Sequence, residues 1–359
     1  MDIIKRKCTI PVKVGDLTIG GGKPVVIQSM TNSQITDFNS TLEQINQLVD
    51  AGCELVRLAV PDQEALKAFS KLAVESPVPL IADIHFDVKL ACRVMDYGAA
   101  KVRINPGNIG GHVNLKKLAL QAKRLNVPIR IGVNAGSLEK QLLKKHGGVT
   151  AAALVESAAG YLEILEEIGY SQVIVSLKAS DVFTTIRAYK LFSEKYSYPL
   201  HLGVTGAGPL QPGMIKGAIG IGALLSEGIG DTIRVSLTAA PVEEVRVARL
   251  IIQSLGLNKY FPDLISCPTC GRCTVDLVSM VGEVEKILQN YSLPLKVAVM
   301  GCAVNGPGEA KEADLGISAG KKHGIVFRNG KVIRTVELSA LLDALKEELD
   351  VLAAPGDRK

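Results

Sequence analysis

Short β-branched apolar runs alternate with amphipathic stretches between residues 25 and 238. The spacing of apolar positions changes between two residues, which is typical of strands, and about 3.6 residues, which is typical of helices. Repeated strand and helix units of this kind predict a parallel sheet covered by helices. The predicted strands span residues 24–29, 54–60, 80–85, 101–105, 129–134, 172–178, 201–205 and 232–237.

The number of these units indicates how the sheet is arranged. Eight units within about 240 residues match the size of a closed eight-stranded barrel, whereas an open doubly wound sheet usually has fewer strands. We therefore predict a TIM (β/α)8 barrel over residues 1–258, with its last helix at 242–255. Residues 256–262 contain the Gly, Asn and Pro expected of a domain boundary.

The last hundred or so residues follow a different pattern, which predicts a small α+β domain over 262–359. A cysteine-bearing turn comes first. We then expect a helix at 275–289, a strand at 295–300, a Gly-rich loop at 301–308, a strand around Leu315, a hairpin turning at Asn329 and Gly330, and a closing helix at 339–352.

Composition narrows the classes of function. With 47% apolar residues the chain can bury a large core, and it lacks a secretory segment or an apolar run long enough to span a bilayer, so we expect a cytoplasmic protein. Its net charge is +5, yet aromatics are only 4% and Trp is absent, which removes a stacking platform for nucleic acid. A small anionic ligand is the better interpretation.

Charged and polar side chains gather at the predicted carboxyl ends of the strands, where TIM-barrel active sites lie. Period-two alternation places several pairs on common strand faces. These pairs are Asp83 with His85, Arg103 with Asn105, Ser176 with Lys178, and Arg234 with Ser236, and comparable positions hold Arg57, Arg130, Asn134 and Thr205.

The cations of this set outnumber its acids, since Asp83 is the only acid clearly among them. Burying unpaired charge is costly, whereas Arg pairs strongly with phosphate. The excess predicts a ligand with more than one negative charge, such as a diphosphate. The alternative is a one-residue shift of some strands, which would turn those side chains outward.

Cysteines cluster near the C-terminus, and without a secretion signal they favour metal ligation over disulfides. Cys267 and Cys270 share one turn, and Cys302 opens a Gly-rich loop that ends at Glu309. An iron-sulfur cluster and a structural zinc ion both remain possible with such ligands. Cys273 extends the first pair to a C-x2-C-x2-C run, which leaves open which thiols bind.

These residues resemble the IspG or GcpE family, the bacterial 4-hydroxy-3-methylbut-2-enyl diphosphate synthases of the methylerythritol phosphate (MEP) route to isoprenoids. The resemblance spans nearly the whole chain. It rests on the segments VVIQSMTN (25–32), ADIHF (82–86), KVRINPGN (101–108), SCPTC (266–270) and GCAVNGPGEA (301–310).

The resemblance implies a 4Fe-4S cluster held by Cys267, Cys270, Cys302 and, at rest, Glu309, with no role for Cys273. It implies that the substrate is 2-C-methyl-D-erythritol 2,4-cyclodiphosphate, gripped by the strand-end residues. Glu309 would leave the cluster to admit a substrate oxygen. Flavodoxin or ferredoxin is the implied electron donor, and a homodimer with a shared active site is the implied assembly.

Two rival interpretations follow from the residues alone. One is a phosphate-binding TIM-barrel lyase or transferase with a structural zinc domain. The other is a cluster-bearing sensor that binds nucleic acid through its basic surface, although it gives no reason for the strand-end arginines.

Overall fold

The computed structural model describes residues 4–291, 293–302 and 311–354. The chain divides into two compact units, Met1–Asn258 and Lys259–Lys359. None of the helices in the described ranges combines the length and apolar character that a membrane span requires.

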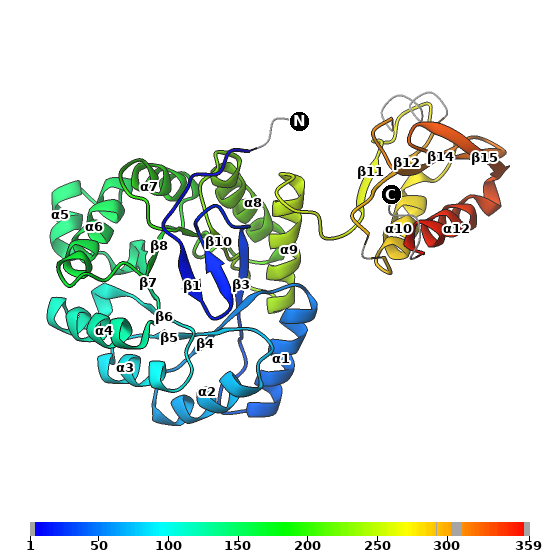
Figure 1. Ribbon diagram of the computed structural model, residues 1–359. Helices are drawn as coiled ribbons and strands as arrows, with labels where there is room; N and C mark the ends of the chain where they lie inside the picture. The colour runs from blue at the N-terminus through cyan, green and yellow to red at the C-terminus, as the bar shows by residue number, and fades with distance from the viewer. Residues whose placement is uncertain (1–3, 292, 303–310, 355–359) are drawn as a thin grey trace. The chain divides into compact units, whose positions relative to one another are not determined.

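The first unit is an eight-stranded parallel barrel in the order β8-β7-β6-β5-β4-β3-β10-β9 (Figure 1). A parallel bridge between Val175 and Leu200 joins the two ends of this order and closes the barrel. The strands are β3 (Val26–Met30), β4 (Leu55–Ala59), β5 (Leu80–Ile84), β6 (Lys101–Ile104), β7 (Ile129–Asn134), β8 (Val173–Lys178), β9 (His201–Leu202) and β10 (Thr232–Ile233).

Helices surround the barrel strands, as Figure 1 shows. Several begin at an acidic residue just past a strand: Asp62, Asp87 and Asp181 each accept a hydrogen bond from a backbone N–H of the first turn. The helices are α1 (Phe38–Asp50), α2 (Gln63–Glu75), α3 (Val88–Asp96), α4 (His112–Leu125), α5 (Lys140–His146), α6 (Ala151–Glu167), α7 (Val182–Lys195), α8 (Leu210–Ser226) and α9 (Pro241–Ser254), with short 3-10 turns η1 (Pro106–Asn108) and η2 (Ala135–Ser137).

An N-terminal hairpin, β1 (Val12–Val14) and β2 (Leu17–Ile19), covers the amino ends of the strands. Its side chains Val12, Val14 and Ile19 are fully buried. They form one apolar cluster with residues from barrel strands, namely Val26, Leu55, Ile81 and Ile174. The hairpin therefore closes the amino end of the barrel. The opposite end, where the carboxyl ends of the strands lie, is the mouth of the barrel.

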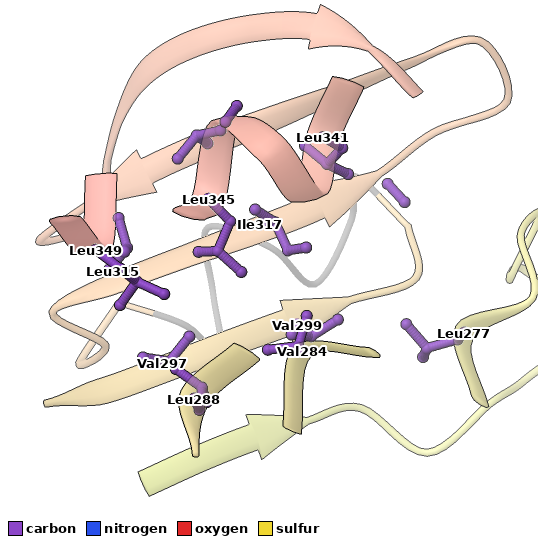
Figure 2. Packing of buried hydrophobic residues seen from close by; sticks show 13 residues of the cluster. Leu277, Val284, Leu288, Val297, Val299, Leu315, Ile317, Leu341, Leu345 and Leu349 are labelled. Atoms are coloured by element: carbon purple, nitrogen blue, oxygen red, sulfur yellow. The ribbon is translucent and has the colours of Figure 1, made fainter. Parts of the chain in front are cut away.

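The second unit contains a five-stranded mixed sheet in the order β11-β12-β13-β14-β15. Its strands are β11 (Asp263–Ser266), β12 (Lys296–Met300), β13 (Leu315–Ala319), β14 (His323–Arg328) and β15 (Lys331–Glu337), and its helices are α10 (Leu277–Leu288), the turn η3 (Leu338–Ala340) and α12 (Leu341–Ala353). Figure 2 shows the core, in which Leu345 and Leu349 of α12 lie against Ile317 and Leu315 of β13.

The predicted TIM barrel followed by a smaller α+β unit is confirmed. Two strand predictions were too long, because β9 and β10 end at Leu202 and Ile233, so that Thr205 and Ser236 lie in loops. Gly203 follows β9 directly, and the chain leaves the sheet there. The sequence patterns also missed the β1–β2 hairpin and β11, which are only three or four residues per strand.

The hairpin generates a stability prediction. Ile19→Ala removes a fully buried side chain from the cluster beneath the barrel, so the free energy of unfolding should fall by about 2–5 kcal/mol. Urea unfolding followed by far-UV circular dichroism checks this, since the chain lacks Trp. Val74→Ala is the control, because Val74 is 81% exposed on α2. Equal midpoints for the two variants would show that the hairpin does not stabilise the barrel.

Candidate active site

The strand register decides which side chains face the barrel interior. Arg57 pairs with Ile81, Asp83 with Arg103, and Arg103 with Arg130. Paired residues on neighbouring strands point to the same side of the sheet. The charge of Arg57 on β4 also acts on Lys178, across the barrel on β8, so this shared side is the interior. The structure therefore brings the predicted cations together.

Asp83 is the acidic centre of this group. Its Oδ1 accepts a hydrogen bond from Arg103 Nη1 at 2.8 Å, and its Oδ2 lies 3.4 Å from Arg57 Nε. Burial raises the pKa of Asp83, but the charges of Arg57 and Arg103 outweigh burial and hold that pKa at about 2. Burial also lowers the pKa of Arg57 to about 10. At neutral pH the Asp83 carboxylate and the Arg57 guanidinium group are therefore both charged.

His85 follows β5 and contacts the same arginine. Its Nε2 lies 2.7 Å from Arg103 Nη1. A guanidinium group can only donate, so Nε2 accepts and the neutral ring carries its proton on Nδ1. Burial lowers the pKa of His85; the negative charge of Asp83 opposes this effect, and the positive charges of Arg103 and Arg57 add to it. The neutral ring leaves one N–H donor for a ligand at the mouth.

Arg234, just past β10, is held by an acid from outside the strands. Its Nε and Nη2 donate to the two carboxylate oxygens of Glu244 on α9, both at 3.0 Å. Glu244 also accepts from Ser29 Oγ at 2.9 Å and from Leu237 N at 3.1 Å. The sequence argument counted only Asp83 among the acids and was wrong in that count, because Glu244 lies on a helix.

Two glycines on the inner face make room for long cationic side chains. A β-carbon at Gly203 would lie 2.6 Å from Lys178 Nζ, and one at Gly132 would lie 3.0 Å from Arg103 Nε. A larger residue at either position would displace the cation beside it. Lys178 thus crosses the mouth over β9, and Arg103 lies over β7.

The remaining predicted residues lie around the rim, and part of their hydrogen-bonding capacity is already used. Asn105 donates to Ser137 Oγ at 2.6 Å and accepts from Gly107 N at 3.2 Å. Ser137 in turn donates to the carbonyl oxygen of Asn134 at 3.1 Å. These bonds tie the loops after β6 and β7 together. Ser176 lies inside on β8, whereas Thr205 and Ser236 lie in the loops beyond β9 and β10.

A further group of polar side chains lies one strand step below the mouth, and the sequence argument missed it. This group consists of Gln28, Lys101 and His201, which are at most 1% exposed. They stand two residues before Met30, Arg103 and Gly203. In the described part of the chain, no partner lies near Lys101 Nζ, His201 Nε2, the Gln28 amide, or Nε and Nη1 of Arg130. Period-two alternation, extended toward the amino ends, would have found these residues.

The cysteines lie at one edge of the second unit. Parallel pairing of β11 with β12 brings the strand ends before Cys267 and Cys302 together. The Gly301 N–H contacts Cys267 Sγ at 3.4 Å. Cys270 is exposed, whereas Cys273 contacts the Val275 carbonyl oxygen at 3.3 Å and packs against the apolar core. A donor set of thiols at one strand edge suits a thiophilic metal centre in kind.

Glu309 lies outside the described residues. Within the described ranges, no three His, Cys, Asp or Glu side chains converge closely enough to hold a metal ion. The structure therefore places Cys267 and Cys302 at one edge but leaves Cys270 turned to solvent.

A separate apolar groove of about 260 Å³ lies between α8 and α9. Met214, Val247, Leu250 and Ile251 line it with small residues, and its described lining carries no charged side chain. Such a surface does not suit an anionic ligand. The charged mouth is therefore the candidate active site.

The fold, the cationic mouth and the cysteine edge together define a TIM-barrel protein with a cysteine-bearing second domain. A family model described as the GcpE TIM-barrel domain matches residues 9–249, and one described as the GcpE protein C-terminal domain matches residues 263–351. The chain belongs to the GcpE family.

Curated relatives match along almost their whole length. A protein of Caldanaerobacter subterraneus subsp. tengcongensis is 52% identical over 345 residues, which is 96% of this chain and 97% of that protein. One of Bacillus subtilis is 51% identical over 352 residues, with 98% and 93% covered. Both are named 4-hydroxy-3-methylbut-2-en-1-yl diphosphate synthase (flavodoxin).

A solved structure, the dihydropteroate synthase of Yersinia pestis, is similar in fold. Its TM-score is 0.50 at 13% identity, with 69% of this chain and 98% of that chain covered. At this identity the likeness concerns the fold alone.

Lys101 generates a prediction on stability. Burial, together with the charges of Arg130 and Arg57, lowers its pKa well below 10.5. Between the folded pKa and 10.5 the unfolded chain binds a proton that the folded chain lacks, so this group destabilises the fold increasingly as pH falls. Lys101→Met should therefore raise Tm, by about 2–4 °C for each kcal/mol removed.

Thermal unfolding of the wild type and Lys101→Met across neutral to alkaline pH provides the measurement. The gain in Tm should shrink as pH rises toward 10.5. Lys67→Met, at an exposed position of α2, controls for the loss of one positive charge. A gain that does not change with pH, or a loss at every pH, would contradict the prediction.

Proposed function

We propose that this chain is a 4-hydroxy-3-methylbut-2-enyl diphosphate synthase. It reductively opens and dehydrates 2-C-methyl-D-erythritol 2,4-cyclodiphosphate in the MEP pathway of isoprenoid synthesis. The observation that carries the proposal is the set of buried, poorly balanced cations at the mouth of a GcpE-family barrel. The printed names of relatives at 51–52% identity support the same reaction.

The diphosphate supplies the negative charge that the mouth lacks. Arg57, Arg103, Arg130 and Lys178 are at most 8% exposed, and Asp83 is already bonded to two of them. We assign these cations the main grip on the diphosphate, because charge-assisted bonds to phosphate offset the cost of their burial. Arg234 contributes its outer Nη1, since Glu244 holds the other two nitrogens.

The neutral residues position the ligand at the rim. His85 offers its Nδ1–H, and Asp83 orients Arg103, which in turn fixes the His85 ring. Ser176 lies beneath the ligand on β8. Asn105, Asn134, Thr205 and Ser236 complete the proposed set in the surrounding loops.

In the second unit, Cys267, Cys270, Cys302 and Glu309 would hold a 4Fe-4S cluster. When bound, such a cluster supplies single electrons, which a two-electron reductive dehydration requires. Flavodoxin, named in the relatives' titles, is the proposed donor, with ferredoxin as the other candidate. From the resemblance we also propose a cytoplasmic homodimer with the active site shared between subunits.

Anaerobic turnover tests the proposed function. Purified chain, supplied with the cyclodiphosphate and a chemical reductant, should form 4-hydroxy-3-methylbut-2-enyl diphosphate, detected by phosphorus NMR and mass spectrometry. Arg103→Met should raise KM by about 10- to 100-fold, because a charge-assisted bond to phosphate is lost. Iron-loaded protein that consumes no cyclodiphosphate would refute the assignment, and zinc-loaded, colourless protein would favour the lyase or transferase alternative.

The cysteine edge provides a matched pair of variants. Cys270→Ala removes an exposed thiol that we assign to the cluster, whereas Cys273→Ala removes a thiol that contacts the Val275 carbonyl oxygen and the core. Anaerobic iron and sulfide content should fall strongly in Cys270→Ala and stay near the wild-type value in Cys273→Ala. The reverse pattern would assign the binding role to Cys273 instead.

A further inference from the structure

Beneath the mouth, on the inner face of the barrel, lies a set of polar side chains to which the proposed function assigns no contact with the diphosphate. Lys101 is 0% exposed, two residues before Arg103 on β6. Residues two positions apart on a strand lie on the same face, so Lys101 lies one step deeper in the barrel than Arg103. Gln28 and His201 lie at similarly deep positions on β3 and β9. Among the described residues, Lys101 Nζ has no hydrogen-bonding partner.

The charges around Lys101 are mostly positive. Burial lowers the pKa of Arg130 on the neighbouring strand, but a guanidinium group holds its proton far more tightly than an amine does, so Arg130 keeps the charge. Asp83, the nearest acid on the neighbouring strand β5, is already bonded to Arg103 and Arg57. Among the described residues, the charged or titratable groups around this interior are Arg57 (β4), Asp83 (β5), His85 (after β5), Arg103 (β6), Arg130 (β7), Lys178 (β8), His201 (β9), Arg234 (after β10) and Glu244 (α9).

A second full charge on Lys101 would therefore stand in a desolvated site without a counter-ion. Such a charge costs several kcal/mol, and an amine avoids that cost by releasing its proton. Burial, then the charges of Arg130 and Arg57, lower the pKa of Lys101. His201 is buried among the same cations, and its pKa also falls well below 6.5, so its ring stays neutral.

We propose that Lys101 supports the diphosphate site from beneath, with its amine uncharged in the empty barrel and protonated by one proton from solvent when the diphosphate enters. This inference rests on the proposed function, since it needs a diphosphate in the mouth. The entering negative charge supplies the missing counter-ion for Lys101 and Arg130 together. Lys101 acts through charge, one step below the groups that touch the ligand.

Proton uptake on binding is the direct test. Inorganic pyrophosphate is titrated into the full-length, anaerobically purified chain by calorimetry, in buffers of different ionisation enthalpy, between about pH 6.5 and pH 9.5. The wild type should take up close to one proton more per pyrophosphate than Lys101→Met over part of this range. Titration of pyrophosphate itself is common to both proteins and cancels in the difference.

The pH profile of affinity gives a second readout. Where the extra proton is taken up, the ratio of variant to wild-type Kd should fall about tenfold per pH unit as pH rises. Lys67→Met is the control for the loss of one lysine, because Lys67 is exposed on α2. That variant should bind pyrophosphate as the wild type does and keep the extra proton.

The outcomes separate the two proposals. Equal proton uptake by the wild type and Lys101→Met at every pH overturns the role of Lys101 and leaves the proposed function standing. Burial, then the charges of Arg130 and Arg57, also lower the pKa of Lys178, so loss of the extra proton in Lys178→Met with retention in Lys101→Met would assign the proton to Lys178 and overturn the role of Lys101. A wild type that binds no pyrophosphate overturns the diphosphate site and the role of Lys101 together.

Discussion

Positive charge that is buried with too little negative charge to balance it is the constraint on which this barrel depends. Arg57, Arg103 and Arg130 share a desolvated interior with Asp83 as their nearby carboxylate. Ordinary barrels fill this space with branched apolar side chains, which stabilise the fold. In this barrel, charged side chains occupy that part of the interior and do not provide this apolar stabilisation. The apolar packing lies beneath the strands and between the strands and the helices.

The arrangement of neighbours follows from this constraint. Gly132 and Gly203 have no side chains where Arg103 and Lys178 pass. Glu244 reaches Arg234 from helix α9, outside the strands. The site is thus positively charged before any ligand arrives, and this preorganisation lowers the reorganisation needed on binding.

Much of the fold followed from the sequence because its apolar periodicity is strong. The strand at 129–134 was predicted at the limits that the structure shows for β7. The short strands β9 and β10 could not be delimited, since Gly203 and Arg234 continue the sequence pattern beyond the last paired residues, Leu202 and Ile233. The β1–β2 hairpin was not predicted for another reason, because three residues per strand are too few to show a period in the apolar positions.

The site was predictable only in part. Alternation places Asp83, Arg103 and Lys178 on inner faces without knowledge of the fold. It cannot show which of them already have partners, so the bonds of Asn105 to Ser137 and of Glu244 to Arg234 came from the structure. For the cysteines, spacing did not distinguish Cys270 from Cys273, whereas exposure and the Val275 contact do.

The N-terminal hairpin determines from which end ligand, water and protons can enter and leave the barrel. Because Val12, Val14 and Ile19 cover the amino ends of the strands, the interior can be reached only from the carboxyl end of the barrel. Ligand, water and protons then share a single route, and whatever enters must leave before the next molecule can arrive. When entry and exit share one end of the barrel, release of the product from the mouth is a step that can limit the rate of turnover.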